Sequence, residues 1–168
     1  MSDANDVTNC HPALQQALAI LLKPYALTIT PVADNRPIPG SFFGDREAGL
    51  IANQLYIRQD TPLHSALHEA SHYICMDAAR RATLNTDADS EGLYDEENAV
   101  CYLQIILADF LPLFNRARMM RDMDRWGYSF RLGSTKSWFE QDAEDALLWL
   151  QRYAILDDNQ QPTWQLRQ

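Results

Sequence analysis

The amino-acid sequence predicts a helix-rich α+β domain with a small sheet in its N-terminal half. Apolar residues recur with helical spacing in four long segments, whereas the alternation typical of strands is confined to two short ones. The predicted helices span 11–23, 61–81, 94–110 and 137–156, and the predicted strands span 25–32 and 50–58. A chain of 168 residues fits one hydrophobic core. We therefore expect a single domain over residues 11–168, preceded by a loose terminus at residues 1–10.

The N-terminal half is expected to begin with a helix and to continue into the sheet. Pro12 lies where the first turn of a helix tolerates proline. Segment 25–32 alternates and is rich in β-forming residues, which favours a strand. Segment 33–49 contains several prolines and glycines and is predicted to be a loop. Segment 50–58 then forms either one strand or two short ones.

The clearest helix is predicted over residues 61–81. Thr61 can cap it, and Pro62 then occupies its first position. A polar connection over residues 82–93 leads to a second strong helix at 94–110, which Pro112 is expected to stop. Two long helices joined by a short connection are expected to lie side by side.

The C-terminal part is predicted to be helical as well. The basic segment 114–126 carries four arginines, which form either a solvated helix face, the reading we favour, or a docking patch for an acidic partner. These arginines are Arg116, Arg118, Arg121 and Arg125. Segment 127–135 is a turn or a short strand. Ser137 and Glu140 have the spacing of a capping box at the start of the last helix.

Composition limits the classes of protein to consider. A hydrophobic fraction of 46% and a charged fraction of 22% are typical of a globular protein. No apolar run approaches the roughly 20 residues that span a bilayer, and the N-terminus lacks the pattern of a secretory signal. The net charge of −9 disfavours binding to nucleic acid and to anionic membranes. Three cysteines without Cys-x-x-Cys spacing (Cys10, Cys75 and Cys101) argue against a disulfide framework and favour a cytoplasmic protein, in which Cys75 and Cys101 are expected to be core residues.

The segment LHSALHEASHY, residues 63–73, is the strongest functional signal. Because a helix turns by about 100° per residue, His68 and His72 lie on the same face, and Glu69 lies beside them. Two imidazoles with this spacing can hold one metal ion, and the adjacent carboxylate can accept a proton from water. A solvent-exposed polar face is the alternative. His64, one turn earlier, is expected at the rim of the site.

A third ligand is expected among the acids that open the following helix, because two histidines do not complete a metal site. On a helical wheel Glu96 falls on the buried face, where a carboxylate needs a partner, whereas Glu97 points toward solvent. We therefore expect Glu96 as the ligand and Glu97 as the second choice. The alternative is that these acids only interact favourably with the positive end of the helix dipole. Tyr73 and Tyr94 flank these ligands, so either phenol is a candidate to stabilise an oxyanion.

Residues on both sides of the motif resemble a known enzyme family. SALHEASHY, the following Ala79-Arg80-Arg81 and the helix AVCYLQIILADFLPLFN at 99–115 are similar to the bacterial elongation factor P hydroxylases. This resemblance covers roughly residues 53–115. It implies a mononuclear iron held by His68 and His72, and hydroxylation of a modified lysine on a translation factor.

The two metal-bearing helices also resemble a second family. His-Glu-x-x-His followed by EENAVCYLQIILADFLP is similar to the ImmA/IrrE-type zinc metallopeptidases, with Glu96 and Ala99 in register. This resemblance implies a zincin-like fold in which the motif helix packs against the glutamate-bearing helix.

Three functions therefore remain open. We place an iron-dependent protein hydroxylase slightly ahead of a zinc metallopeptidase in which Glu69 is the general base. The third is a non-catalytic metal-binding interaction module. The first two share one divalent metal, Fe²⁺ or Zn²⁺, and a protein or peptide substrate.

Overall fold

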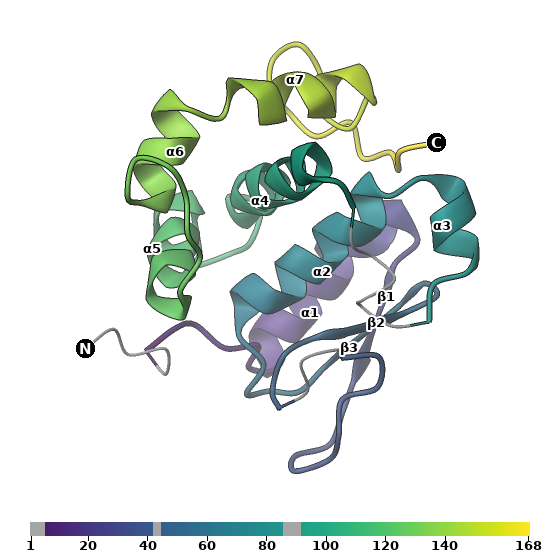
Figure 1. Ribbon diagram of the computed structural model, residues 1–168. Coiled ribbons are helices and arrows are strands. Elements are labelled where there is room, and N and C mark those ends of the chain that lie inside the picture. The colour runs from purple at the N-terminus through teal and green to yellow at the C-terminus, as the bar shows by residue number, and fades with distance from the viewer. Residues whose placement is uncertain (1–5, 42–44, 86–91) are drawn as a thin grey trace.

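The computed structural model describes residues 6–41, 45–85 and 92–168 (Figure 1). Within these ranges the chain forms seven α-helices, one short 3-10 helix and a three-stranded sheet, which confirms the helix-rich α+β class. The elements are α1 (Pro12–Leu22), η1 (Lys23–Tyr25), β1 (Thr28–Pro31), β2 (Gly49–Ile51), β3 (Gln54–Ile57), α2 (Leu63–Cys75), α3 (Ala78–Ala82), α4 (Tyr94–Ala108), α5 (Arg116–Trp126), α6 (Thr135–Gln141) and α7 (Glu144–Arg152).

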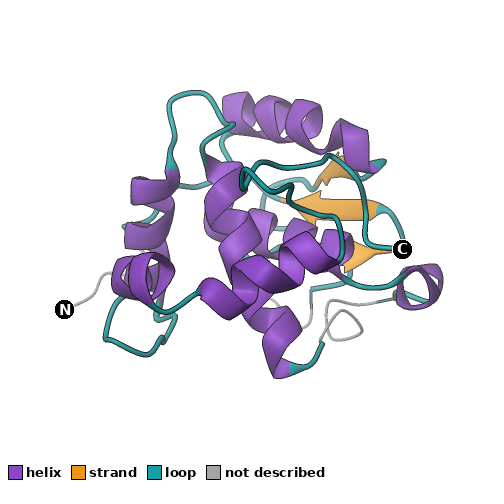
Figure 2. Ribbon diagram, turned by 90° about the horizontal axis from the view of Figure 1, so that it is seen from above, coloured by secondary structure: helices purple, strands orange, loops and turns teal. Residues whose placement is uncertain are grey.

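The sheet has the order β1-β3-β2 and lies to one side of the molecule (Figure 2). β1 runs parallel to β3, whereas β2 pairs with β3 in the antiparallel sense. Leu50 pairs with Leu55 across the hairpin, and both side chains are fully buried. Of the two arrangements expected for 50–58, the pair of short strands is confirmed, with Ala52 in the left-handed region at the turn.

Helix α2 occupies the centre of the fold and is buried on nearly all sides. It packs against β2 and β3 as well as against α4 and α5, and Figure 1 shows α4 lying beside it. The predicted apolar face is confirmed, because Leu63, Ala66 and Ala70 have no exposed surface. The opposite face is covered as well: His64 is 1% and His72 4% exposed. The alternative of a solvent-exposed polar face is therefore wrong.

The helix predicted over 61–81 is divided into two. The backbone is extended at Met76, and Asp77 begins α3 by accepting a hydrogen bond from the Arg80 N–H at 2.9 Å. The expected cap at Thr61 is also wrong. Its hydroxyl accepts from the Arg58 N–H at 2.9 Å, and Pro62 itself occupies the N-cap position.

The last predicted helix is also divided, into α6 and α7, and it begins earlier than expected. Ser134, not Ser137, is the cap, and its hydroxyl accepts from the Ser137 N–H at 3.1 Å. The predicted capping box with Glu140 is therefore wrong. Segment 127–135 is a turn, opened by Gly127 in the left-handed conformation that ends α5.

The four arginines of α5 have partners within the chain. Arg116 pairs with Asp109 and Arg125 with Asp6, each at 2.6 Å. Arg121 lies 3.4 Å from Asp122, and Arg118 donates to the Leu113 carbonyl and to the Thr8 hydroxyl. Because these contacts offset the positive charge locally, α5 fits a solvated helix face better than a docking patch.

The described part of the N-terminus is anchored. The Cys10 N–H donates to the Thr61 carbonyl at 2.7 Å, and Asn9 forms a bridge with Pro62. Residues 6–10 therefore do not form the loose terminus that we expected, while residues 1–5 lie outside the described ranges. The three cysteines are free, and Cys75 and Cys101 are buried as expected; Cys10 is buried as well, as part of the anchored N-terminal segment. None of the described helices has the length and apolar character needed to cross a bilayer.

Candidate metal centre

Three side chains from α2 and α4 converge between the two helices. The Nε2 atoms of His68 and His72 are 3.1 Å apart. Glu97, in the first turn of α4, places one carboxylate oxygen 3.1 Å from His68 Nε2 and the other 3.3 Å from His72 Nε2. In the described ranges these residues form a group of three that could hold a metal ion.

The spacing of these donor atoms fits a metal ion. Bonds of about 2.0–2.2 Å separate neighbouring ligand atoms by about 3.0 Å at a right angle and about 3.4 Å at a tetrahedral angle. The three observed separations, between 3.1 and 3.3 Å, lie in this interval. Two imidazoles and one carboxylate suit both Zn²⁺ and Fe²⁺. The geometry therefore supports a metal site without selecting between these two ions.

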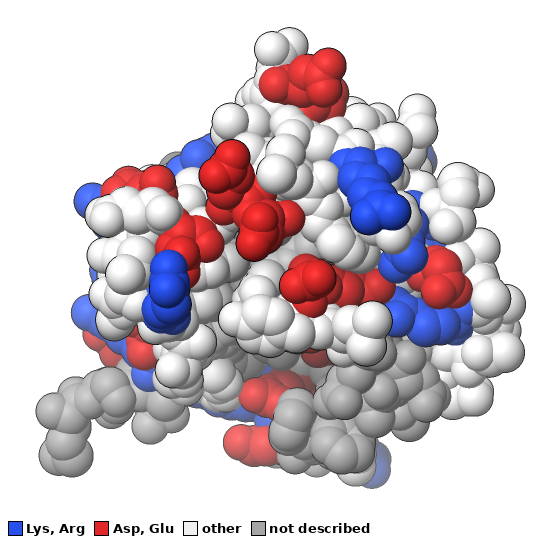
Figure 3. Space-filling model, turned by 45° about the horizontal axis from the view of Figure 1, so that its top comes forward, with Lys and Arg blue, Asp and Glu red and all other residues white. Residues whose placement is uncertain are grey.

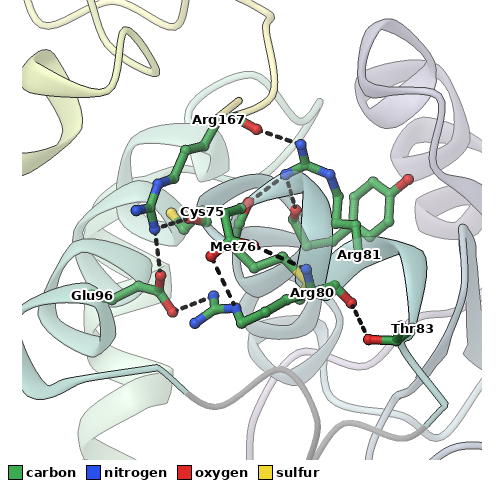
Figure 4. Close-up of polar contacts among 9 residues, drawn as sticks. Cys75, Met76, Arg80, Arg81, Thr83, Glu96 and Arg167 are labelled. Atoms are coloured by element: carbon green, nitrogen blue, oxygen red, sulfur yellow. Dashed lines mark hydrogen bonds and ion pairs between the residues drawn. The ribbon is translucent and has the colours of Figure 1, made fainter.

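The structure places Glu97, rather than the Glu96 that the helical wheel favours, beside the two histidines. The wheel correctly placed Glu96 in the interior, where it is 4% exposed. Its partners there are two arginines rather than a metal (Figure 4): Arg80 at 2.7 Å and Arg167 at 2.9 Å. Gly92 also lies against it, since a Cβ there would be 1.7 Å from a Glu96 oxygen.

The ionisable groups of the triad affect one another strongly. Burial alone would raise the pKa of Glu97, but hydrogen bonds from His68 and His72 hold it below its usual range. Burial lowers the pKa of His72. Burial also opposes the charged form of His68, yet its neighbours, including Tyr128 and Glu97, raise its pKa well above the usual value. Metal binding would displace the proton that His68 holds in the metal-free protein.

Gln104 fixes the orientation of His68. Its Oε1 lies 2.6 Å from His68 Nδ1, and its amide donates to the His64 carbonyl at 3.3 Å. Oε1 therefore accepts the Nδ1 proton and leaves His68 Nε2 as the ligand atom, an arrangement common for metal-bound histidines. Gln104 is not among the site residues expected from the sequence. The available signal was an amide within the apolar part of this helix, two turns after Glu97 and hence on the same face.

His64 lies inside the protein rather than at a rim. Its Nδ1 is 3.2 Å from the Tyr128 hydroxyl, and its ring packs against Trp126 with centroids 4.9 Å apart. Burial lowers the pKa of His64 to about 3, so this imidazole is neutral at physiological pH.

Tyr128 is the phenol that the structure brings to the triad. Its ring meets His68 edge-on, with centroids 5.8 Å apart, and burial raises its pKa to about 12. The carboxylate of Glu69, which is 9% exposed, raises the pKa of Tyr128 further by electrostatic repulsion of the phenolate. The two expected tyrosines lie elsewhere: the Tyr73 ring packs under Arg81, and Tyr94 is 80% exposed.

A cavity of about 330 Å³ lies beside the start of α4, lined by Tyr94 among others; none of the three candidate ligands lines it. Its lining is linked to the triad at two points, since Asn98 follows Glu97 and Phe130 stacks on Tyr128 at 6.4 Å. Asp95 is among its acidic residues. On the face that carries α6 and α7, acidic side chains gather near the middle (Figure 3).

Comparison with known proteins found no matching family model, curated protein or solved structure.

Proposed function

We propose that this chain is a mononuclear metal-dependent enzyme that hydrolyses peptide bonds, with His68, His72 and Glu97 as the ligands. The observation that carries this proposal is Glu69, a carboxylate that is 9% exposed and directly follows the first ligand on an enclosed helix. Two imidazoles and one carboxylate serve hydrolases and oxygenases alike. A further carboxylate is what hydrolysis requires, because the attacking water must lose a proton.

A metal ion and two side chains would share the catalytic work. A bound Zn²⁺ would polarise the substrate carbonyl and lower the pKa of water toward about 7. Glu69 would accept the proton from the attacking water and pass it to the leaving amine. The Tyr128 hydroxyl, which keeps its proton at neutral pH because its pKa is raised, would donate a hydrogen bond to the developing oxyanion.

Replacing Glu69 by glutamine tests this assignment. We expect cleavage of a fluorogenic peptide mixture by zinc-loaded protein to fall at least about 100-fold, because the proton acceptor is lost. Zinc affinity, measured by competition with a chelator, should not change. The matched control is Glu140→Gln, at an exposed position on α6. Cleavage that persists in the Glu69 variant would refute the hydrolytic role.

Hydroxylation is the second candidate. Two histidines and one carboxylate are also the ligand set of non-haem iron oxygenases, and the sequence resembles elongation factor P hydroxylases on both sides of the motif. Elemental analysis of anaerobically purified protein separates the two candidates. Iron, together with oxygen consumption in the presence of elongation factor P, would favour hydroxylation; zinc alone would favour hydrolysis. A protein that contains no metal and keeps its stability after chelation would indicate a non-catalytic module.

A further inference from the structure

Arg167 joins the ends of the two helices that carry the metal ligands. Its guanidinium donates to Glu96, in the first turn of α4, at 2.9 Å and to the carbonyl of Cys75, the last residue of α2, at 3.2 Å. Its own backbone N–H donates to the Ile74 carbonyl at 3.0 Å. Figure 4 shows its guanidinium between Cys75 and Glu96, in contact with both. One residue thus contacts both helices near the ligands.

The guanidinium of Arg167 is itself held in place. It lies over the ring of Tyr153, 4.0 Å from the centroid, and over Trp149 at 5.1 Å. Its backbone carbonyl accepts a hydrogen bond from Arg81, which also donates to the Met76 carbonyl (Figure 4). The side chain is 17% exposed. Contacts on two aromatic faces and on its backbone fix a fork that would otherwise have many rotamers.

The contacts of Arg167 bear directly on the ligand geometry. Glu96 is the residue next to Glu97, and Cys75 follows His72 by less than one helical turn. A shift of the first turn of α4 away from α2 would therefore lengthen the separation between Glu97 and both histidines. Arg80 holds the second oxygen of Glu96 at 2.7 Å, so this carboxylate is clamped from two sides.

We propose that Arg167 is a positioning residue for the metal site: it holds Glu97 within reach of His68 and His72 by anchoring Glu96 to the end of α2. This inference rests on the proposed metal site. It assigns the segment around residue 167 a role in metal affinity, although that segment supplies no ligand to the group identified among the described residues.

The test compares zinc affinity in Arg167→Ala with that in Arg152→Ala. Arg152 is a matched control because its guanidinium lies over the same Tyr153 ring, 5.6 Å from the centroid, but belongs to the exposed end of α7. Affinity for zinc alone is measured by chelator competition, on protein shown to be folded by circular dichroism. We expect about a tenfold or greater loss in Arg167→Ala, the range seen when outer partners of ligands are removed, and no change in Arg152→Ala.

Hydrogen exchange gives a second measurement that does not depend on metal. The Glu97 N–H donates to the Leu93 carbonyl at 3.0 Å, and we expect faster exchange at this amide in Arg167→Ala only. If that variant does not fold, Arg167→Lys replaces it. Lysine keeps the charge but loses the fork that reaches Glu96 and Cys75 together, so zinc affinity should still fall several-fold.

Each outcome is decisive. Unchanged zinc affinity in a folded Arg167 variant overturns this inference and leaves the proposed function standing. An equal loss in Arg152→Ala also overturns it, because the effect would then be general destabilisation. A wild-type protein that binds no zinc or iron overturns both this inference and the proposed function.

Discussion

Glu96 and Glu97 are adjacent acids in the first turn of α4, and they have opposite surroundings. Glu96 is 4% exposed and is neutralised by Arg80 and Arg167. The Glu97 side chain is 42% exposed, yet it lies against the half-buried His68 and the buried His72. A helix separates neighbouring side chains by about 100°, so one faces the end of α2 and the other its middle. The more buried acid is therefore the structural one, and the more exposed acid is the candidate ligand.

The comparison of Glu96 and Glu97 shows that burial alone does not identify a metal ligand. A buried carboxylate needs a compensating charge, but an arginine fork satisfies this need as well as a cation does. A ligand, by contrast, must have other donor atoms at the right separation and leave room for water or substrate. Partial exposure of Glu97 is compatible with that requirement.

Replacing each of the two acids separately is expected to give the largest effects. In Glu97→Ala we expect zinc affinity to fall at least about 100-fold, because a direct ligand is lost. The free energy of unfolding of the metal-free protein should fall by less than it does in Glu96→Gln, because the Glu97 side chain is 42% exposed and its interactions with the histidines are screened by solvent. Chelator competition and urea unfolding measure the two quantities.

The companion variant, Glu96→Gln, should show the reverse pattern. Removing the charge between two arginines should reduce the free energy of unfolding by about 3 kcal/mol, whereas zinc affinity should fall only about tenfold, through the displacement of Glu97. If Glu96→Gln impairs zinc binding more than Glu97→Ala does, the assignment of the two acids is inverted.

Replacing Gln104, the hydrogen-bond partner of His68, should have a smaller effect on zinc affinity. Gln104→Leu removes the acceptor that lies 2.6 Å from His68 Nδ1, so we expect zinc affinity to fall about 10- to 100-fold. Gln104→Glu keeps an acceptor at this position and should retain most of the affinity. Equal losses in both variants would show that Gln104 contributes packing rather than orientation of the imidazole.

The smallest effect concerns the pH dependence of stability. Burial lowers the pKa of His64 to about 3 and also lowers that of His72, from an ordinary value of 6.5. The unfolded chain therefore binds more protons than the folded protein below about pH 6.5. The stabilisation that comes from these two histidines is fully present above that pH and is lost as the pH falls.

Urea unfolding of the metal-free protein at pH 7 and pH 5 measures this loss. We expect His64→Phe to reduce it by roughly 1–2 kcal/mol, because one titrating group is removed. His68, one turn away, has a raised pKa, so its contribution is instead lost as the pH rises. An identical loss of stability in the variant and the wild type would show that His64 is not the responsible group.

The His-Glu-x-x-His motif and its helix, the small sheet and the pairing of two long helices were all predictable, because they depend on local periodicity and on residue spacing. The breaks at Met76 and at Asp142–Ala143 were not. Apolar spacing continues through both, and the helices end where the Asp77 side chain begins α3 and where Asp142 pairs with Arg131. Such endings depend on partners that local patterns do not contain.

The sequence by itself determined that two histidines share one face of a buried helix with a glutamate beside them, because helical geometry alone sets their directions. Only the tertiary structure decided which acid reaches them. Arg167 is 71 residues from Glu96 in the chain and neutralises the acid that the wheel had selected. Gln104 reaches His68 from α4, and Tyr128 reaches it from the turn that follows α5. Which acid reaches the histidines depends on how separate elements pack. The residue pattern along one helix does not show which charged groups of other elements lie against it.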